Sequence, residues 1–197
     1  MTYSQGREEE IILKFIGSRK EGSVFDIGAF DGKTNSNSLA LIERGWTAVL
    51  VEPSPSCFLK LLACHEGNPK VHLLNAAVGV EGGIRRFYEF ENDQCGSTLE
   101  KNAAVWKSEE RKCREYFLPQ VTVSQIVAQL GGGADVLSVD TEGTSYEVMA
   151  SCPIKSWSPK VIIVEHDNRI IELSGWASEN KYSVIGLNAE NILLGKD

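Results

Sequence analysis

A short glycine-rich loop is the first feature of this sequence with the residues for ligand chemistry. Gly28 and Gly32 come directly after the apolar run 24–27, and glycines at such a point let the backbone turn sharply and approach a ligand closely. Phe30 stands where a dinucleotide-binding loop has its second glycine, so the loop lacks the feature that admits a pyrophosphate. Asp26, just before the first glycine, favours instead a ligand with a cationic end. In the other interpretation, Asp26 caps the turn and the glycines only shape it.

A glutamate and an asparagine stand at the ends of the next two apolar runs. Glu52 comes after the run 47–51, about 20 residues past the loop, where a carboxylate can accept hydrogen bonds from ribose hydroxyls. Asn75 and Ala76 come after the run 71–74. An asparagine there can donate to and accept from the edges of an adenine, or can simply form a turn. Adenine, ribose and cationic groups are the parts of S-adenosylmethionine, which carries an ammonium and a sulfonium, so we expect this cofactor.

Acidic residues also end the fourth and fifth core runs, 135–139 and 160–164. Asp140 is the candidate for the residue that faces the methyl group, either as a base or by orienting the acceptor. Glu142 is a second candidate, with capping of the helix that follows as its alternative role. His166 is the alternative base because imidazole titrates near neutrality, unless it is a surface histidine. A divalent metal held by these strand ends stays open as a further possibility, since hard cations prefer carboxylates.

Helical and strand patterns alternate along the chain and would position these residues. The core runs are continuously apolar, which is typical of parallel strands covered by helices on both faces. Helical spacing of apolar residues is found in 8–16, 39–44 and 56–64. We therefore predict an α/β fold with a doubly wound, mostly parallel, Rossmann-like sheet. Such a sheet brings the carboxyl ends of its strands to one crevice, where ligands bind.

The rest of the chain has a weaker pattern. Segment 91–120 is polar, and we expect either a cover over the active site or a surface excursion, with a helix around 103–116. Ser124 is the expected cap of the helix 125–130. A terminal antiparallel hairpin is predicted from 182–187 and 191–194.

Length, net charge and cysteine content indicate the class of protein. The 197 residues fit one domain, 1–197, and the net charge of −7 argues against a nucleic-acid partner. No apolar run approaches the roughly 20 residues of a membrane helix, and the sequence starts without a secretory core. The 5 cysteines are dispersed without a CxxC pair, as expected for free thiols in a reducing compartment. These features predict a cytoplasmic protein with no membrane partner.

Nine short motifs in order along the chain resemble a known family. They are Tyr3-Ser4-Gln5, 26–32, Ser36-Asn37, Gly45-Trp46, Val51-Glu52-Pro53, 75–79, 139–143, Tyr146-Glu147 and 163–165. With them the sequence resembles the FkbM-type family of S-adenosylmethionine-dependent methyltransferases over nearly its whole length. The resemblance implies a class I methyltransferase sheet with a final antiparallel strand. It also implies methyl transfer to an oxygen, often on a sugar or secondary metabolite.

Carried over to this sequence, the resemblance implies cofactor contacts at Asp26, Gly28, Gly32, Glu52 and the turn 75–76. Together with two loop neighbours, the expected cofactor-binding residues are Asp26, Gly28, Ala29, Gly32, Glu52, Pro53, Asn75 and Ala76. The resemblance places the pair formed by Asp140 and Glu142 at the mouth of the site. The acceptor is then expected to be a small molecule or a sugar.

Two other functions compete with methyl transfer. One is a nicotinamide-dependent oxidoreductase, which Phe30 and the absence of a Tyr-x-x-x-Lys pair disfavour. The other is a binding module that keeps the fold and the cofactor without catalysis. Replacing Asp140 by alanine should separate an enzyme from such a module.

Overall fold

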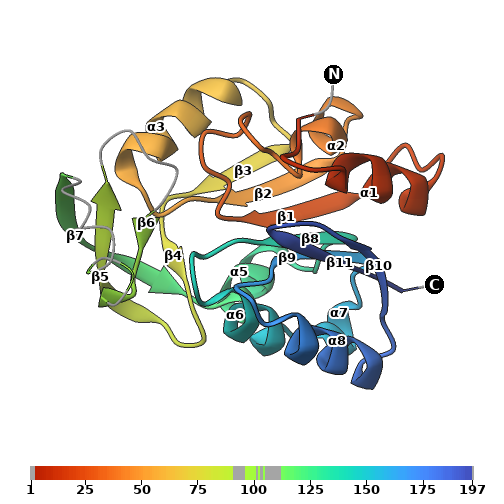
Figure 1. Cartoon of the computed structure of the whole chain (residues 1–197). Coiled ribbons are helices and arrows are strands. Elements are labelled where there is room, and N and C mark those ends of the chain that lie inside the picture. The colour runs from red at the N-terminus through yellow and green to blue at the C-terminus, as the bar shows by residue number, and fades with distance from the viewer. Residues whose placement is uncertain (1–2, 91–95, 101, 103, 105–111, 197) are drawn as a thin grey trace.

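A central sheet organises the protein in the computed structural model, which describes residues 3–90, 96–100, 102, 104 and 112–196 (Figure 1). Its strands are β1 (Ser23–Ile27), β2 (Thr47–Val51), β3 (Val71–Leu74), β8 (Val136–Val139), β9 (Val161–Glu165), β10 (Ser183–Leu187) and β11 (Asn191–Gly195). Their order is β10-β11-β9-β8-β1-β2-β3. The five strands from β9 to β3 are parallel, while β11 is antiparallel to both β9 and β10. The predicted sheet and its antiparallel hairpin are confirmed.

Helices cover both faces of this sheet (Figure 1). They are α1 (Glu8–Ile16), α2 (Leu39–Glu43), α3 (Pro55–Cys64), α5 (Val123–Leu130), α6 (Ser145–Ser151), α7 (Ile154–Trp157) and α8 (Ile170–Glu179). The helices α1, α2 and α3 pack on one face around the buried Trp46, and α5 to α8 pack on the other face around Phe25 and Leu137. Because successive residues of a strand point to opposite faces, a continuously apolar strand contributes side chains to the hydrophobic cores on both faces of the sheet.

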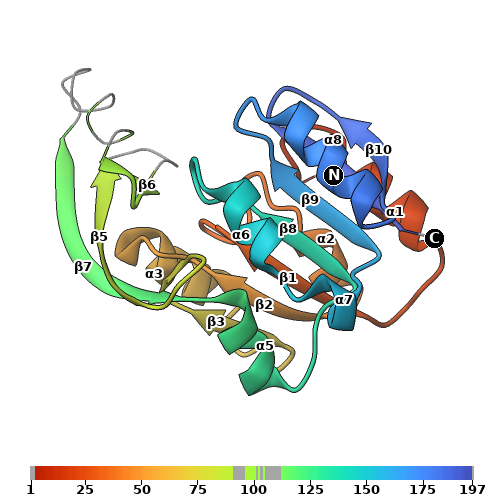
Figure 2. The same cartoon turned by 90° about the horizontal axis from the view of Figure 1, so that it is seen from below.

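A second, smaller sheet stands beside α3, at the end of the central sheet where β3 lies (Figure 2). Its strands, in the order β4-β7-β5-β6, are β4 (Ala77–Val78), β7 (Cys113–Val121), β5 (Gly83–Phe90) and β6 (Gly96–Ser97). The two long strands are antiparallel, from the pair Gly83 and Gln120 to the pair Phe90 and Cys113. This sheet brings Phe87 and Glu89 of β5, together with residues of β4 and Gly96 of β6, to the cavity described below.

Two local predictions were wrong. Residues 113–116, expected at the end of a helix, are in β7, because each pairs with a residue of β5; most of the expected helix lies outside the described residues. Ser124 does not cap the following helix. Thr122 does, with its hydroxyl accepting from the Gln125 backbone N–H and the Gln125 side chain accepting from the Thr122 N–H. This reciprocal capping box satisfies two helix-end donors, which a cap at Ser124 would leave unpaired.

Candidate active site

A cavity of about 340 Å³ opens at the carboxyl ends of β1, β2 and β8. Its volume is in the range of pockets that enclose small ligands, about 300–1,000 Å³. Eight of the eleven residues that sequence analysis selected line it, namely Asp26, Gly28, Ala29, Glu52, Pro53, Ala76, Asp140 and Glu142. Gly32, Asn75 and His166 are not among the lining residues. The cavity therefore brings most of the predicted cofactor residues together with two of the three predicted catalytic residues.

The glycine loop is shaped by contact between neighbouring strands. Gly28 has a φ of +87°, and a Cβ on it would lie 1.9 Å from the carbonyl oxygen of Asp140. Only glycine can therefore stand here, with β1 and β8 in direct contact at the floor of the cavity. Gly32 has a different role, since it turns the chain against α3, where a Cβ would lie 2.6 Å from Leu61.

Asp26 lies at the bottom of the cavity and is buried. The hydroxyl of Ser38 donates to its carboxylate at 2.6 Å, and the hydroxyl of Ser138 donates to it as well. Burial raises the pKa of Asp26, while the two serine hydroxyls oppose that rise. The contact with Ser138 connects β1 to β8, so Asp26 also fixes the two strand ends relative to each other.

Glu52 is held rigidly at the end of β2. Its two carboxylate oxygens accept from the backbone N–H groups of Phe30 and Ser54, at 2.9 and 2.7 Å. Burial raises the pKa of Glu52 to about 8, and the nearby carboxylates of Asp140 and Glu89 contribute to the rise. Each oxygen keeps a second lone pair for a ligand. The side chain is thus oriented before any ligand binds.

Asn75 supports Glu52 from behind the cavity wall. Its amide donates to the carbonyl oxygens of Glu52, at 2.7 Å, and Pro53, at 3.1 Å. The side chain thereby links the residues of the turn after β2, and it is not among the residues that line the cavity. Ala76 and Pro53 line the cavity beside it with small and apolar surface.

Asp140 and Glu165 form a pair of carboxyl groups at the ends of β8 and β9. Asp140 is exposed towards the cavity and is hydrogen bonded to the Glu165 carboxyl and to the backbone N–H of Glu142. Two carboxyl groups share such a bond only when one of them holds a proton. Desolvation raises the pKa of both, and repulsion from Asp140 raises that of Glu165 further. We therefore assign the proton to Glu165 and the charge to Asp140.

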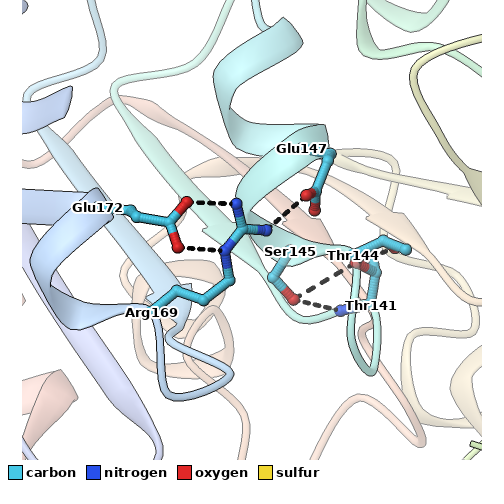
Figure 3. A network of polar contacts seen from close by, with 6 residues as sticks. All are labelled: Thr141, Thr144, Ser145, Glu147, Arg169 and Glu172. Carbon is cyan, nitrogen blue, oxygen red and sulfur yellow. Dashed lines mark hydrogen bonds and ion pairs between the residues drawn. The ribbon is translucent and has the colours of Figure 1, made fainter.

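The loop after β8 is ordered by its own polar contacts (Figure 3). The Ser145 hydroxyl accepts from the Thr141 backbone N–H at 3.0 Å, and the hydroxyls of Thr141 and Thr144 lie 2.9 Å apart. Arg169 at the start of α8 pairs with Glu147 of α6 and with Glu172. The hydroxyl contacts thus hold the loop after Asp140 against the start of α6, and Arg169 joins α6 to α8.

Glu142 connects this loop to the second sheet. It has a φ of +53°, and its carbonyl oxygen accepts from the Ser97 hydroxyl at 3.0 Å and the Asn102 amide at 2.7 Å. Gly96 and Thr98, on either side of Ser97, line the cavity. These residues of the segment 91–120 therefore border the cavity.

His166 is buried behind the β9 end, outside the cavity lining. Its backbone N–H donates to the carbonyl oxygen of Glu190 at 2.8 Å, and its Nδ1 accepts from the Asn168 N–H at 3.1 Å. This arrangement joins the loop after β9 to the hairpin and gives the imidazole a structural use.

Glu89 of β5 is a lining residue that sequence analysis missed. Ser54, Ser56 and Tyr116 donate their hydroxyls to its carboxylate, the last two at 2.8 and 2.9 Å. Burial works to raise the pKa of Glu89, but these hydrogen bonds lower it below its usual value. Phe87 and Glu89 share one face of β5 because they are two residues apart, but only the pairing of β5 with β7 in the fold brings that face to the cavity.

Metal ligands and membrane helices were both searched for in the part of the chain that the structure describes. Within it, no group of three or more histidine, cysteine, aspartate or glutamate side chains is arranged to hold a metal ion. None of the helices in the same residues has the length and apolar character needed to cross a membrane.

The fold and the position of the cavity define the class I methyltransferase fold, and solved structures share it at low sequence identity. A precorrin-6y C5,15-methyltransferase from Geobacter metallireducens GS-15 is 11% identical, with a TM-score of 0.50 over 99% of this chain and 91% of that one. The candidate methyltransferase yhhF from Escherichia coli is 13% identical, with a TM-score of 0.51 over 97% and 84%. A hypothetical protein from Thermus thermophilus is 15% identical, with a TM-score of 0.52 over 98% and 87%.

The chain belongs to the FkbM methyltransferase family, because the model of the methyltransferase FkbM domain matches residues 26–181. The match extends from Asp26 through Glu52 and Asp140 to the start of the C-terminal hairpin, and it confirms the resemblance seen in the motifs. No curated protein matches the sequence. Membership of this family makes the protein a methyltransferase by class and implies S-adenosylmethionine as the methyl donor.

Proposed function

We propose that the protein binds S-adenosylmethionine in this cavity and methylates a hydroxyl oxygen of a small molecule or a sugar. One observation carries the proposal: Glu52 and Asp140 meet in one cavity, at the ends of the strands on either side of β1. Glu52 is oriented to contact the ribose of the cofactor, and Asp140 is oriented to contact the acceptor hydroxyl. When bound, S-adenosylmethionine supplies a methyl group from its sulfonium centre.

The residues present fit this cofactor. The Glu52 carboxylate would accept from the ribose hydroxyls, since its oxygens already have fixed directions. Ala76 and Pro53 offer small, apolar surface beside it for the adenine. Gly28 has no side chain, so the sulfur could approach the backbone closely at the floor of the cavity. The described lining is rich in carboxylates, which suits a ligand that carries positive charge.

Asp140 is proposed to orient the acceptor hydroxyl and accept its proton. The carboxylate faces the cavity, and its hydrogen bonds to Glu165 and Glu142 fix its direction. Desolvation raises the pKa of Asp140 above its usual value, which makes its carboxylate a stronger base than that of an aspartate in free solution. Glu142 would border the acceptor from the same loop. His166 is not required in this scheme, because its Nδ1 is already used by Asn168.

Incubation with S-adenosylmethionine and a panel of sugars and small hydroxylated molecules tests the proposal. A methyl ether in the product mixture, identified by mass spectrometry and NMR, is the expected result. Asp140→Asn keeps the shape of the side chain and should reduce the rate by about 10²- to 10⁴-fold, the usual contribution of a general base. If this variant bound the cofactor and transferred methyl at the full rate, the role of Asp140 would be refuted.

A further inference from the structure

Three amide side chains lie at the end of the cavity formed by the loop before α2. Asn35 and Asn37 belong to that loop, and Gln5 reaches the cavity from the N-terminal segment. The two segments touch, because Ser4 and Asn35 form an isolated parallel β-bridge. None of these residues was selected as a ligand contact from the sequence. The remaining polar lining consists mainly of carboxyl and hydroxyl groups, with Asn191 as a further amide.

Asn37 carries an orphaned acceptor. Its Oδ1 is buried and has no hydrogen-bond partner, while its Nδ2 donates to the Ser138 hydroxyl at 3.2 Å. This orientation is fixed by the hydrogen-bond chain: Ser138 gives its only proton to Asp26, so it must accept from Asn37. A buried acceptor without a partner costs about 1–3 kcal/mol, and such atoms normally have a partner in the functional state.

The segment 3–7, which we call the N-terminal strap, is attached at both of its ends. Glu9 accepts from the backbone N–H of Tyr3 at 2.7 Å, and the hydroxyl of Ser4 accepts from the Glu9 N–H at 3.1 Å. At the other end, the buried carboxylate of Glu8 accepts from Asn188 and Asn191 of the hairpin, at 2.7 and 2.8 Å. The strap therefore spans from the loop before α2 to the hairpin and holds Gln5 at the cavity.

The sheet order shows which part of a ligand would meet these amides. In the proposed function, the ribose lies at Glu52, at the end of β2. Continuing across β1 to β8, the cavity reaches Asp26, Ser138 and Asn37. The amino-acid part of S-adenosylmethionine continues beyond the ribose and carries an ammonium, which only donates, and a carboxylate, which only accepts. No lysine, arginine or histidine is among the described lining residues, so neutral donors must hold that carboxylate.

We propose, on the basis of the proposed function, that Asn37 and Gln5 bind the amino-acid end of the cofactor and that the N-terminal strap is the outer wall of this subsite. The Asn37 Oδ1 accepts from the ammonium, next to the Asp26 carboxylate. The Gln5 amide donates to the carboxylate from the opposite side. The strap thus contributes to cofactor affinity, although it lies before the segment that the family model matches.

Calorimetry with two ligands tests this subsite. S-adenosylhomocysteine has the amino-acid end, and methylthioadenosine has the same adenosine and sulfur without it. Asn37→Ala should weaken S-adenosylhomocysteine about 10- to 100-fold, as expected for a hydrogen bond to a charged group, and Gln5→Ala about 10-fold. Methylthioadenosine should bind to both variants within about 2-fold of its wild-type affinity, by the same reasoning. The matched control Gln129→Ala, an exposed glutamine of α5, should bind both ligands as the wild type does.

The outcomes separate the two proposals. If the wild type binds both ligands and the variants lose both equally, or lose neither, the subsite is refuted while the proposed function stands. If the folded wild type binds neither ligand, both proposals fail. Gln5 is exposed, so Gln5→Ala provides the test by itself if Asn37→Ala does not fold, as judged by its melting temperature.

Discussion

Replacing Glu52 by glutamine should change the pH dependence of the stability of the protein. Glu52 is 6% exposed, and burial raises its pKa from 4.5 to about 8. Between these pH values the folded chain keeps a proton that the unfolded chain has lost. The stabilising effect is therefore complete below about pH 4.5 and is lost as the pH rises towards 8. Glutamine does not titrate, so Glu52→Gln lacks this dependence.

The magnitude can be worked out from the two pKa values of Glu52. Each pH unit in the window corresponds to about 1.4 kcal/mol. The free energy of unfolding of Glu52→Gln relative to wild type should therefore rise by that amount per unit, up to about 5 kcal/mol over the whole window. Glutamine also has only one carbonyl oxygen for the N–H groups of Phe30 and Ser54. That loss is a constant offset and leaves the slope unchanged.

Urea denaturation of both proteins at several pH values from about 5 to 9 covers the window. Subtracting the wild-type value at each pH cancels the titration of groups that both proteins share. The control Glu66→Gln makes the same substitution at an exposed glutamate outside the cavity, and it shows the effect of the substitution itself. A difference between Glu52→Gln and wild type that does not vary with pH would refute the assignment of a raised pKa to Glu52.

Three other measurements test Glu52, Gly28 and the attachment of the N-terminal strap. Binding of S-adenosylmethionine near pH 7 should release protons, because ribose hydroxyls and a cationic ligand favour the ionised Glu52. Calorimetry in buffers of different ionisation enthalpy measures this release, which should be missing in Glu52→Gln. Gly28→Ala should cost about 3 kcal/mol or more of stability, since its Cβ would lie 1.9 Å from the Asp140 carbonyl oxygen; an unchanged melting temperature would contradict this contact. Glu8→Ala should cost about 2–3 kcal/mol and also weaken cofactor binding, because it frees the strap from Asn191. Equal stability and affinity to wild type would show that the strap needs no such attachment.

The central sheet and the side of the cavity that Glu52 lines were predictable because their signals are local in sequence. Continuous apolar runs identify parallel strands, and each candidate ligand contact comes within a few residues of a strand end. Gly28 and Glu52 could thus be selected without knowing any long-range contact. The reason for Gly28 was only visible in the fold, since its Cβ would strike a residue of β8.

The other side of the cavity depends on contacts between distant parts of the chain. Glu89 lies in the cavity because β5 pairs with β7, and Gln5 because Ser4 pairs with Asn35. No local pattern marks either partner. The residue type of His166 suggested a base, whereas its position depends on distant contacts: its backbone N–H pairs with Glu190, and it is not among the residues that line the cavity.

Calorimetric titration of the wild type and Glu52→Gln with S-adenosylhomocysteine, with NAD as the control ligand, tests the central claim most directly. We predict one S-adenosylhomocysteine per chain, no binding of NAD, and a loss of about 10- to 100-fold in the variant, as expected when a charged hydrogen-bond acceptor is removed. Binding of NAD in place of S-adenosylhomocysteine, or equal affinity of the two proteins for S-adenosylhomocysteine, would contradict it.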